Sequence, residues 1–284
     1  MSCLVISLDL EMMWGNREGW SVDEYGRTNV AQVREVVDRL LCLFEKYEVK
    51  ATFAVVGKIM EEGHNEKHAD LYYAPDVIEK LKASKWVEIG THTYSHYIGS
   101  DKRLFEADLK KAIAKAKEEG IEVKSLVFPQ NQVRDEFFAV CQQCGIRAYR
   151  GNPAHFYGAK TKIGKWKNRL CRFVDSYFVL SGMNSYPLEY KEAELMNIPA
   201  SRFLRPYSRR LVFLEGLRFR RIKKEMEYAA RHDEVYHLWW HPHNFGANIN
   251  ENFAFLERIL KTYQELHERF GMRSMTMFEL CCTR

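Results

Sequence analysis

Five residues from three distant segments have side chains suited to metal-assisted hydrolysis. Asp9 and Glu11 follow an apolar run in SLDLEMMWG, His92 and His96 stand in GTHTYSHY, and His241 closes VYHLWWH. Residues i and i+2 of a strand point to the same side, so Asp9 and Glu11 share one face. Two carboxylates that close repel each other unless a cation or a shared proton lies between them. The pair therefore indicates a cation site, with a solvated strand end as the alternative.

The histidines offer ligands of the same kind. His92 and His96 are four residues apart, and such a pair on a turn or helix start points both imidazoles the same way. Several zinc sites present two ligands in this manner. The alternative is a pair of surface histidines, and for His241 an ordinary core or rim histidine.

The elements that would position these side chains alternate between strands and helices. The expected strands are Ser2–Leu8, Ala51–Gly57, Trp86–Gly90, Lys124–Phe128, Ile146–Arg150, Val235–His241 and Met272–Met277. The expected helices are Val30–Tyr47, Pro75–Ser84, Asp101–Glu119, Asp135–Cys144, one that ends near Arg231, and Glu251–Phe270. Repeated β-then-α units predict parallel strands covered by helices. Without a G-x-G-x-x-G motif after the first strand, a distorted β/α barrel of about seven parallel strands is favoured over a dinucleotide-binding sheet.

Length and composition fit one globular domain. The chain has 284 residues, of which 46% are hydrophobic and 29% are charged. We expect a single domain over residues 1–284 with a less regular insertion around 151–217. No apolar run approaches the roughly 20 residues that span a bilayer. Seven cysteines without a basic leader region predict reduced thiols in the cytoplasm.

The candidate residues gather where the expected strands end. Eight candidate residues fall at the carboxyl ends of expected strands, which form the active-site face of β/α barrels. They are Asp9, Glu11, His92, His96, Pro129, Gln130, Arg150 and His241. Two histidines and one carboxylate with an open position form a catalytic metal arrangement. A spare carboxylate and a spare histidine supply a base and an acid. This set predicts metal-assisted hydrolysis.

The order of these motifs resembles the polysaccharide deacetylases, the NodB-homology group, also described as like carbohydrate esterase family four. The motifs are Asp-x-carboxylate, H-T-x-x-H, a strand that ends in Phe-Pro and a late strand that ends in His, over roughly Ser2 to Phe245. The resemblance implies a distorted barrel that removes acyl groups from N-acetylated sugars with a divalent metal.

The resemblance also implies a role for each residue. Asp9 matches the catalytic base, His92 and His96 match metal ligands, and His241 matches the histidine that protonates the leaving amine. The family's third ligand is usually an aspartate next to the base, and Leu10 stands there. Glu11 is the natural replacement, because it shares the strand face with Asp9.

The family's third motif, R-x-P-Y-G, is poorly kept. Pro129 matches, but Val127 stands at the arginine position, and Gln130 and Asn131 replace Tyr and Gly. We expect Arg150, at the end of the next strand, to pair with the base instead. The backbone N–H of Gln130 is the candidate oxyanion donor.

Three further residues have weaker assignments. Asp175, in RFVDSYF, is a candidate to orient His241. Trp14 and Trp239 lie near the expected rim, where an aromatic ring can stack on a sugar. Core packing is the alternative for both rings.

Basic residues crowd together from Arg202 to Lys224, with Glu215 as the single acid, in a chain whose net charge is +5. A solvated basic face is the ordinary interpretation. The sharper one is contact with an anionic membrane surface or a pyrophosphate-linked lipid. RNA binding is a weaker third option without a recognised motif, and no nucleic-acid partner is expected.

These observations predict a metal-dependent amide hydrolase, a carbohydrate N-deacetylase with one divalent ion, for which zinc suits the ligands. The expected substrate is an amino sugar or glycan precursor. The alternatives are a deformylase of lipid-linked amino sugars, an allantoinase-like hydrolase of a small amide, and an inactive carbohydrate-binding relative.

Overall fold

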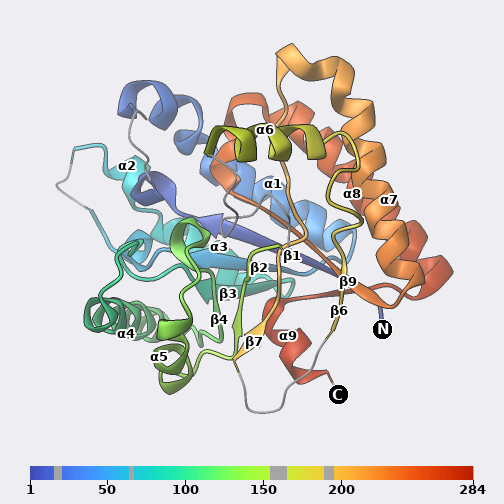
Figure 1. Cartoon of the computed structure of the whole chain (residues 1–284). Coiled ribbons are helices and arrows are strands. Elements are labelled where there is room, and N and C mark those ends of the chain that lie inside the picture. Colours follow the sequence, from blue (N-terminus) through green and yellow to red (C-terminus); the bar gives the residue numbers. More distant parts are fainter. Residues whose placement is uncertain (16–20, 64–66, 154–164, 189–194, 284) are drawn as a thin grey trace.

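A curled, mostly parallel sheet forms the centre of the computed structural model (Figure 1), which describes residues 1–15, 21–63, 67–153, 165–188 and 195–283. Its strand order is β6-β9-β1-β2-β3-β4-β5-β7, with β10 on β1 and β8 on β9. Its pairings are parallel apart from the antiparallel pair β6–β9. The strands are β1 (Cys3–Leu10), β2 (Ala51–Val55), β3 (Val87–Thr91), β4 (Ser125–Leu126), β5 (Ala148–Tyr149), β6 (Tyr186–Pro187), β7 (Met196–Asn197), β8 (Arg202–Phe203), β9 (Glu234–Trp240) and β10 (Arg273–Met275).

One irregular segment joins the two edges of this sheet. At its start, β7 pairs with β5, and at its end β8 pairs with β9. Between them, Ala200 N–H donates to Gly151 O and Ser201 N–H donates to His237 O. The segment therefore closes the curl between β5 and β9, and the predicted distorted β/α barrel is confirmed.

Helices surround the sheet (Figure 1), and the six helices that the hydrophobic periodicity predicts are present. The helices at residues 69–72, 165–175 and 277–282 are not among the predicted ones. The expected helix Asp101–Glu119 is α4, and its N-cap Asp101 accepts hydrogen bonds from the N–H groups of Arg103 and Leu104. The helices are α1 (Val33–Lys46), α2 (Ala69–Tyr72), α3 (Pro75–Ala83), α4 (Lys102–Glu118), α5 (Phe138–Gln143), α6 (Lys165–Asp175), α7 (Glu215–Arg231), α8 (Ile249–Phe270) and α9 (Met277–Cys282). None of the helices in the described part of the chain combines the length and apolar character that a membrane span requires.

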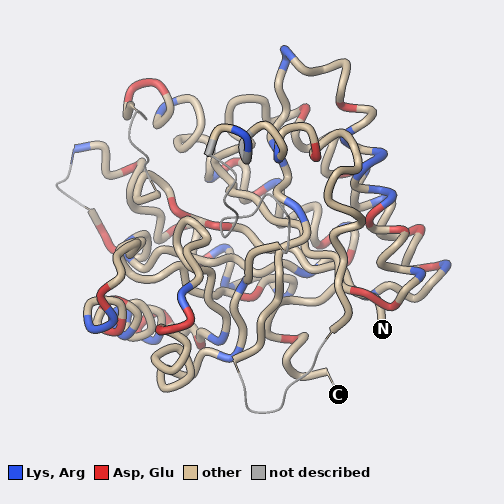
Figure 2. Tube along the Cα trace, in the orientation of Figure 1, with Lys and Arg blue, Asp and Glu red and all other residues tan. Residues whose placement is uncertain are grey.

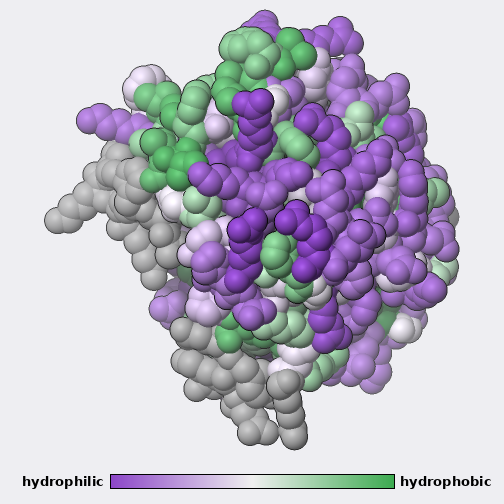
Figure 3. All heavy atoms as spheres, turned by 90° about the vertical axis from the view of Figure 1, so that its right-hand side faces the viewer, coloured by the Kyte–Doolittle hydropathy of each residue, from purple (hydrophilic) through white to green (hydrophobic). Residues whose placement is uncertain are grey.

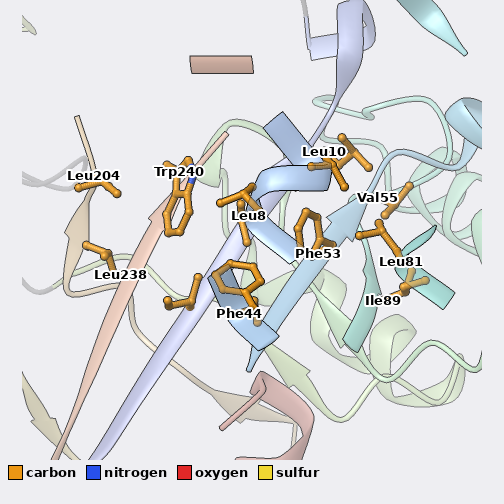
Figure 4. Close-up of a cluster of buried hydrophobic side chains, with 14 of the residues drawn as sticks. Leu8, Leu10, Phe44, Phe53, Val55, Leu81, Ile89, Leu204, Leu238 and Trp240 are labelled. Carbon is orange, nitrogen blue, oxygen red and sulfur yellow. The ribbon is translucent and has the colours of Figure 1, made fainter. Parts of the chain in front are cut away.

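The side chains of β1 alternate between the two faces of the strand, and this alternation separates the core from the site. Leu8 and Leu10 point outward into the apolar layer between strands and helices, where Phe44 of α1 and Phe53 of β2 pack (Figure 4). Ser7 and Asp9, on the opposite side of the strand, are buried as well. Successive side chains of a strand point to opposite faces, so the same strand fixes the core on one side and carries polar groups on the other.

At the start of β1, the side chains that point into the barrel interior are apolar, and they pack against α9. Cys3 and Val5 of β1 belong to a separate buried cluster with Met275, Met277 and Leu280. A capping box at Thr276 and Glu279 starts α9. The polar groups of β1 are therefore confined to the end of the barrel where the strands finish.

The basic stretch Arg202–Lys224 is not simply a solvated face, which corrects that interpretation. The side chains of Arg202, Arg218 and Arg221 are at most 8% exposed. Arg202 bonds both oxygens of Glu225 at 2.7 Å, and Arg221 lies 3.1 Å from the same carboxylate. A buried arginine requires a buried partner, and Glu225 of α7 supplies it.

The Glu225 carboxylate should be essential to the stability of the buried cluster that it forms with Arg202 and Arg221. Glu225→Gln leaves two buried guanidinium groups with a weaker counter-charge, so we expect a loss of about 3–5 kcal/mol in the free energy of unfolding, as for other broken buried pairs. Urea unfolding measures it. The control Glu227→Gln, whose carboxylate lies 4.0 Å from Lys223 at the surface, should change stability by less than about 0.5 kcal/mol. A loss below about 1 kcal/mol for Glu225→Gln would contradict the assignment.

Candidate active site

Asp9 and Glu11 lie at the carboxyl end of β1, and both are almost fully buried, at 2% and 5% exposed. His241 follows β9, which pairs with β1 so that Trp240 stands beside Leu8. Its Nε2 lies 3.7 Å from Asp9 Oδ2 and 3.4 Å from Glu11 Oε1. One imidazole nitrogen thus faces both carboxylates, which places them on one side as predicted.

Three imidazoles converge on one oxygen of Glu11. Its Oε1 lies 3.0 Å from His92 Nε2 and 3.3 Å from His96 Nε2, in addition to the His241 contact. Its other oxygen packs against Gly15, where a Cβ would stand 1.9 Å from Oε2. Glycine at position 15 therefore leaves room for this carboxylate.

The histidine pair does not lie on a helical turn, which corrects that part of the prediction. Thr93 and His96 have φ values of 63° and 59°, so the backbone turns irregularly through the left-handed region. Such strain persists where surrounding contacts hold it. Asp108 of α4 accepts hydrogen bonds from Tyr94 N–H, Ser95 N–H and Ser95 Oγ. The two rings still converge, with centroids 5.0 Å apart.

The donor set fits a metal ion. His92 Nδ1–H donates to the carbonyl of Val127 at 2.7 Å, which leaves Nε2 as the free ligand atom. His96 Nε2 is buried and, among the described residues, has no hydrogen-bond partner. The ligand atoms of Glu11, His92 and His96 lie within 4.8 Å of one another. Two imidazoles and a carboxylate are ligands that zinc prefers.

Arg150 pairs with Asp9 as expected. Its Nη1 and Nη2 donate to the two oxygens of Asp9 at 2.6 and 2.7 Å. The guanidinium lies 4.1 Å from the centroid of the Trp239 ring, and Nη2 also donates to Asn131 Oδ1 at 2.9 Å. This bidentate, stacked geometry is specific to arginine. Trp239 thus contacts the arginine that orients Asp9.

A second buried histidine supports the same arginine. His237 Nε2 lies 2.8 Å from Ser7 Oγ, which also accepts a hydrogen bond from Arg150 Nη1 at 3.0 Å. Burial, with the nearby Arg150 charge, lowers the pKa of His237 to about 3. A neutral ring that donates from Nδ1 to Ile198 O at 3.2 Å accepts the Ser7 proton at Nε2. His237 is therefore a positioning residue.

Asn244, rather than Asp175, contacts the outer nitrogen of His241. Asn244 Nδ2 lies 3.2 Å from His241 Nδ1. Asp175 instead accepts hydrogen bonds from Leu180 N–H and from Ser181 N–H and Oγ, and it pairs with Arg202 at 3.2 Å. The assignment of Asp175 as the partner of His241 is corrected, because its carboxylate belongs to the buried cluster of Glu225.

The remaining predicted residues lie around the rim. Gln130 is exposed and has a φ of 53° after the buried Pro129. Trp14 donates its indole N–H to Tyr72 O at 2.9 Å, and the Lys58 ammonium lies 4.2 Å from its ring centroid. The oxyanion and sugar-stacking roles of these residues stay predictions.

The electrostatics keep both carboxylates ionised. Burial alone would raise the pKa of Asp9, but Arg150, His92 and His241 outweigh it and lower the pKa. Burial likewise opposes ionisation of Glu11, yet the imidazoles hold its pKa well below the usual value. For His241, the charges of Glu11 and Asp9 outweigh burial and raise the pKa. The arrangement pairs an ionised carboxylate with a histidine that readily carries a proton.

Removal of either ring from the histidine pair should abolish metal binding. We expect wild-type protein to bind about one zinc ion per chain in equilibrium dialysis, and His92→Ala and His96→Ala to lose it, because each removes one of three ligands. The control His232→Ala removes an exposed ring that stacks on Tyr228 and should retain zinc. Equal zinc in all four proteins would contradict the site.

The comparisons with known proteins agree with the fold. Residues 23–149 match the family model described as polysaccharide deacetylase, a range that includes His92 and His96. A provisionally assigned polysaccharide deacetylase from Mycobacterium smegmatis has a TM-score of 0.63 at 14% identity, over 99% of this chain and 89% of that chain. One of the same description from Pseudomonas aeruginosa PAO1 has a TM-score of 0.60 at 16% identity, over 99% and 89%.

A third solved structure is a CE4 family pseudoenzyme from Bacillus anthracis, with a TM-score of 0.54 at 13% identity, over 99% of this chain and 65% of that chain. A search of curated proteins found no match. Asp9, Glu11, Arg150 and His241 lie outside the matched range 23–149. The barrel nevertheless brings them to the two histidines inside it. The segment 23–149 belongs to the polysaccharide deacetylase family.

Proposed function

We propose that the protein is a metal-dependent hydrolase that removes an N-acyl group from an amino sugar or glycan precursor, and that this acyl group is acetyl. The family match supports a carbohydrate deacetylase in general. The observation that carries the finer proposal is the position of Glu11 Oε1, which faces three imidazole nitrogens beside the Asp9–Arg150 pair. This geometry supports a site in which three metal ligands, a base and an acid meet.

Glu11, His92 and His96 would hold the ion, for which zinc is our first choice. When bound, such an ion lowers the pKa of water towards about 7 and polarises a carbonyl oxygen. Asp9 accepts the proton of the attacking water, at the Oδ2 that faces His241. Arg150 grips both of its oxygens, so the carboxylate is held in one orientation.

His241 supplies the proton for the leaving group. An amide nitrogen departs as an amine and requires protonation as the C–N bond breaks. The Nε2–H of His241 is aimed at the two carboxylates, while Asn244 holds Nδ1. Its part-exposed position at the rim lets it reach the substrate nitrogen. The N–H of Gln130 is our candidate second donor to the developing oxyanion.

The setting and the form of the substrate are further parts of the proposal. All seven cysteines are free thiols, which supports a cytoplasmic protein that acts on a precursor sugar. A lipid-linked form of that sugar is consistent with the basic residues at and near the rim.

An inactive carbohydrate-binding protein is the second candidate, because a pseudoenzyme is among the similar folds.

Acyl release from amino-sugar substrates tests the function. Zinc-loaded wild-type protein should release acetate from N-acetylated amino sugars, and formate in a parallel assay would assign it as a deformylase. Asp9→Asn and His241→Asn should each lose at least about 100-fold in kcat, as expected for general base and acid. Tight sugar binding without release of either acid, with zinc bound, would favour the inactive relative.

Arg150 should matter for turnover more than for binding. Arg150→Lys keeps the charge but loses the bidentate grip on Asp9, so we expect kcat to fall about 10- to 100-fold with little change in KM. Steady-state kinetics measures both constants. The control Arg147→Lys alters an exposed arginine that precedes the same strand and should leave kcat unchanged. Equal effects of the two substitutions would remove Arg150 from the mechanism.

A further inference from the structure

Exposed hydrophobic side chains concentrate in two segments outside the site. Eleven large hydrophobic residues of the described chain are exposed, and seven of them lie between residues 166 and 213. The most exposed are Trp166 of α6, at 74%, and Phe213, just before α7, at 75%. The others are Leu170, Phe178, Val179, Leu180 and Val212. Scattered exposed hydrophobic residues are ordinary, but a concentration of this kind marks an interaction surface.

The two segments lie side by side. The guanidinium of Arg205 lies 5.1 Å from the centroid of the Phe173 ring of α6. Arg221 donates to the carbonyl of Gly182 at 2.6 Å, and Arg202 donates to the carbonyl of Asp175 at 3.0 Å. Figure 1 shows α6 and the chain that leads into α7 at the same end of the molecule, and Figure 3 shows hydrophobic residues gathered along that upper edge.

The exposed charges among these hydrophobic residues are positive. Lys167 and Arg172 of α6, and Arg209 and Arg210 beside Phe213, are exposed. Figure 2 shows lysine and arginine along α6, the chain above it and α7. Within the described residues 165–188 and 205–224, the acids are the buried Asp175 and Glu215, which pairs with Arg218. The surface is thus both basic and apolar.

This surface begins at the rim of the site. The Phe203 ring of β8 lies 6.0 Å from the His241 ring, and β8 runs parallel to β9. The chain therefore leaves the barrel at the end where His241 stands, and it reaches Arg209 and Phe213 a few residues later. A planar partner on this surface would lie beside the opening of the site.

We propose that the surface formed by α6, residues 178–180 and residues 209–213, called here the α6–Phe213 surface, binds an anionic lipid bilayer. Aromatic and aliphatic side chains enter the headgroup region while lysine and arginine meet the negative lipids. The absence of exposed acids from the described part of this surface provides the charge complementarity. Its exposed Trp166 and Phe213 are of the residue types that interfacial amphipathic segments place in the headgroup region.

The surface also bears on the substrate, a consequence that rests on the proposed function. An enzyme that lies on a bilayer with its site at the edge of the contact acts on sugars presented at that surface. The substrate class is then an amino sugar carried by a lipid rather than a free sugar.

Sedimentation with vesicles tests the surface without any assay of activity. Wild-type protein should bind vesicles of phosphatidylcholine with about 30% phosphatidylglycerol at low salt, as expected of a basic amphipathic surface. It should not bind vesicles of phosphatidylcholine alone. Binding should weaken about tenfold or more in each of two double variants, Arg209→Glu with Arg210→Glu and Trp166→Ser with Phe213→Ser. Asp9→Asn should bind like wild type, which separates this proposal from the proposed function.

The matched controls lie on α4, away from this surface. Lys102→Glu with Arg103→Glu changes two exposed basic residues, and Leu104→Ser changes a side chain that is 59% exposed; both variants should bind as wild type does. No binding of wild type to the anionic vesicles overturns the proposal. Equal losses in the α4 and α6–Phe213 variants also overturn it. A wild-type dimer that Trp166→Ser with Phe213→Ser converts to a monomer, without vesicle binding, would assign the surface to self-association instead.

Discussion

Two buried carboxylates at the end of β1 impose the constraint on which the rest of the site depends. An ionised group that leaves water requires a compensating charge or several hydrogen bonds. Asp9 receives both from Arg150, and Glu11 receives three imidazole nitrogens around one oxygen. The difference between these two surroundings is what gives the two carboxylates different chemistry: one is held by a fixed cation, and the other faces ligands that can share a metal.

Neighbouring residues maintain these different surroundings of Asp9 and Glu11. At position 127, where the family motif has an arginine, the backbone carbonyl of Val127 orients His92. The guanidinium comes instead from Arg150, one strand further along the sheet, and Ser7, Asn131 and Trp239 hold it in place. The altered third motif therefore does not leave Asp9 without a cation. The same charge reaches the same carboxylate from a neighbouring strand.

Much of this could be predicted because local pattern and position agree. Hydrophobic periodicity located the main strands and helices, and the rule that barrel sites lie at the carboxyl ends of strands selected Asp9, Glu11, the histidines and Arg150. Contacts across the fold could not be predicted in the same way. Asn244 stands three residues after His241, a local signal that could have found it, whereas Asp108 acts from a helix on an irregular loop. Arg202 and Arg221 look like surface charges in sequence, and only the fold shows Glu225 between them.

Zinc affinity distinguishes the role proposed for Asp9, a base beside the metal, from the role proposed for Glu11, a metal ligand. Isothermal titration of zinc into Asp9→Asn and Glu11→Gln, each checked for native folding by circular dichroism, compares their roles in one experiment. We predict that Asp9→Asn binds zinc within about tenfold of wild type and that Glu11→Gln weakens binding at least about 100-fold, because one removes a neighbour of the metal and the other a ligand. Loss of zinc from Asp9→Asn with retention in Glu11→Gln would show that the two carboxylates have exchanged roles and would contradict this account.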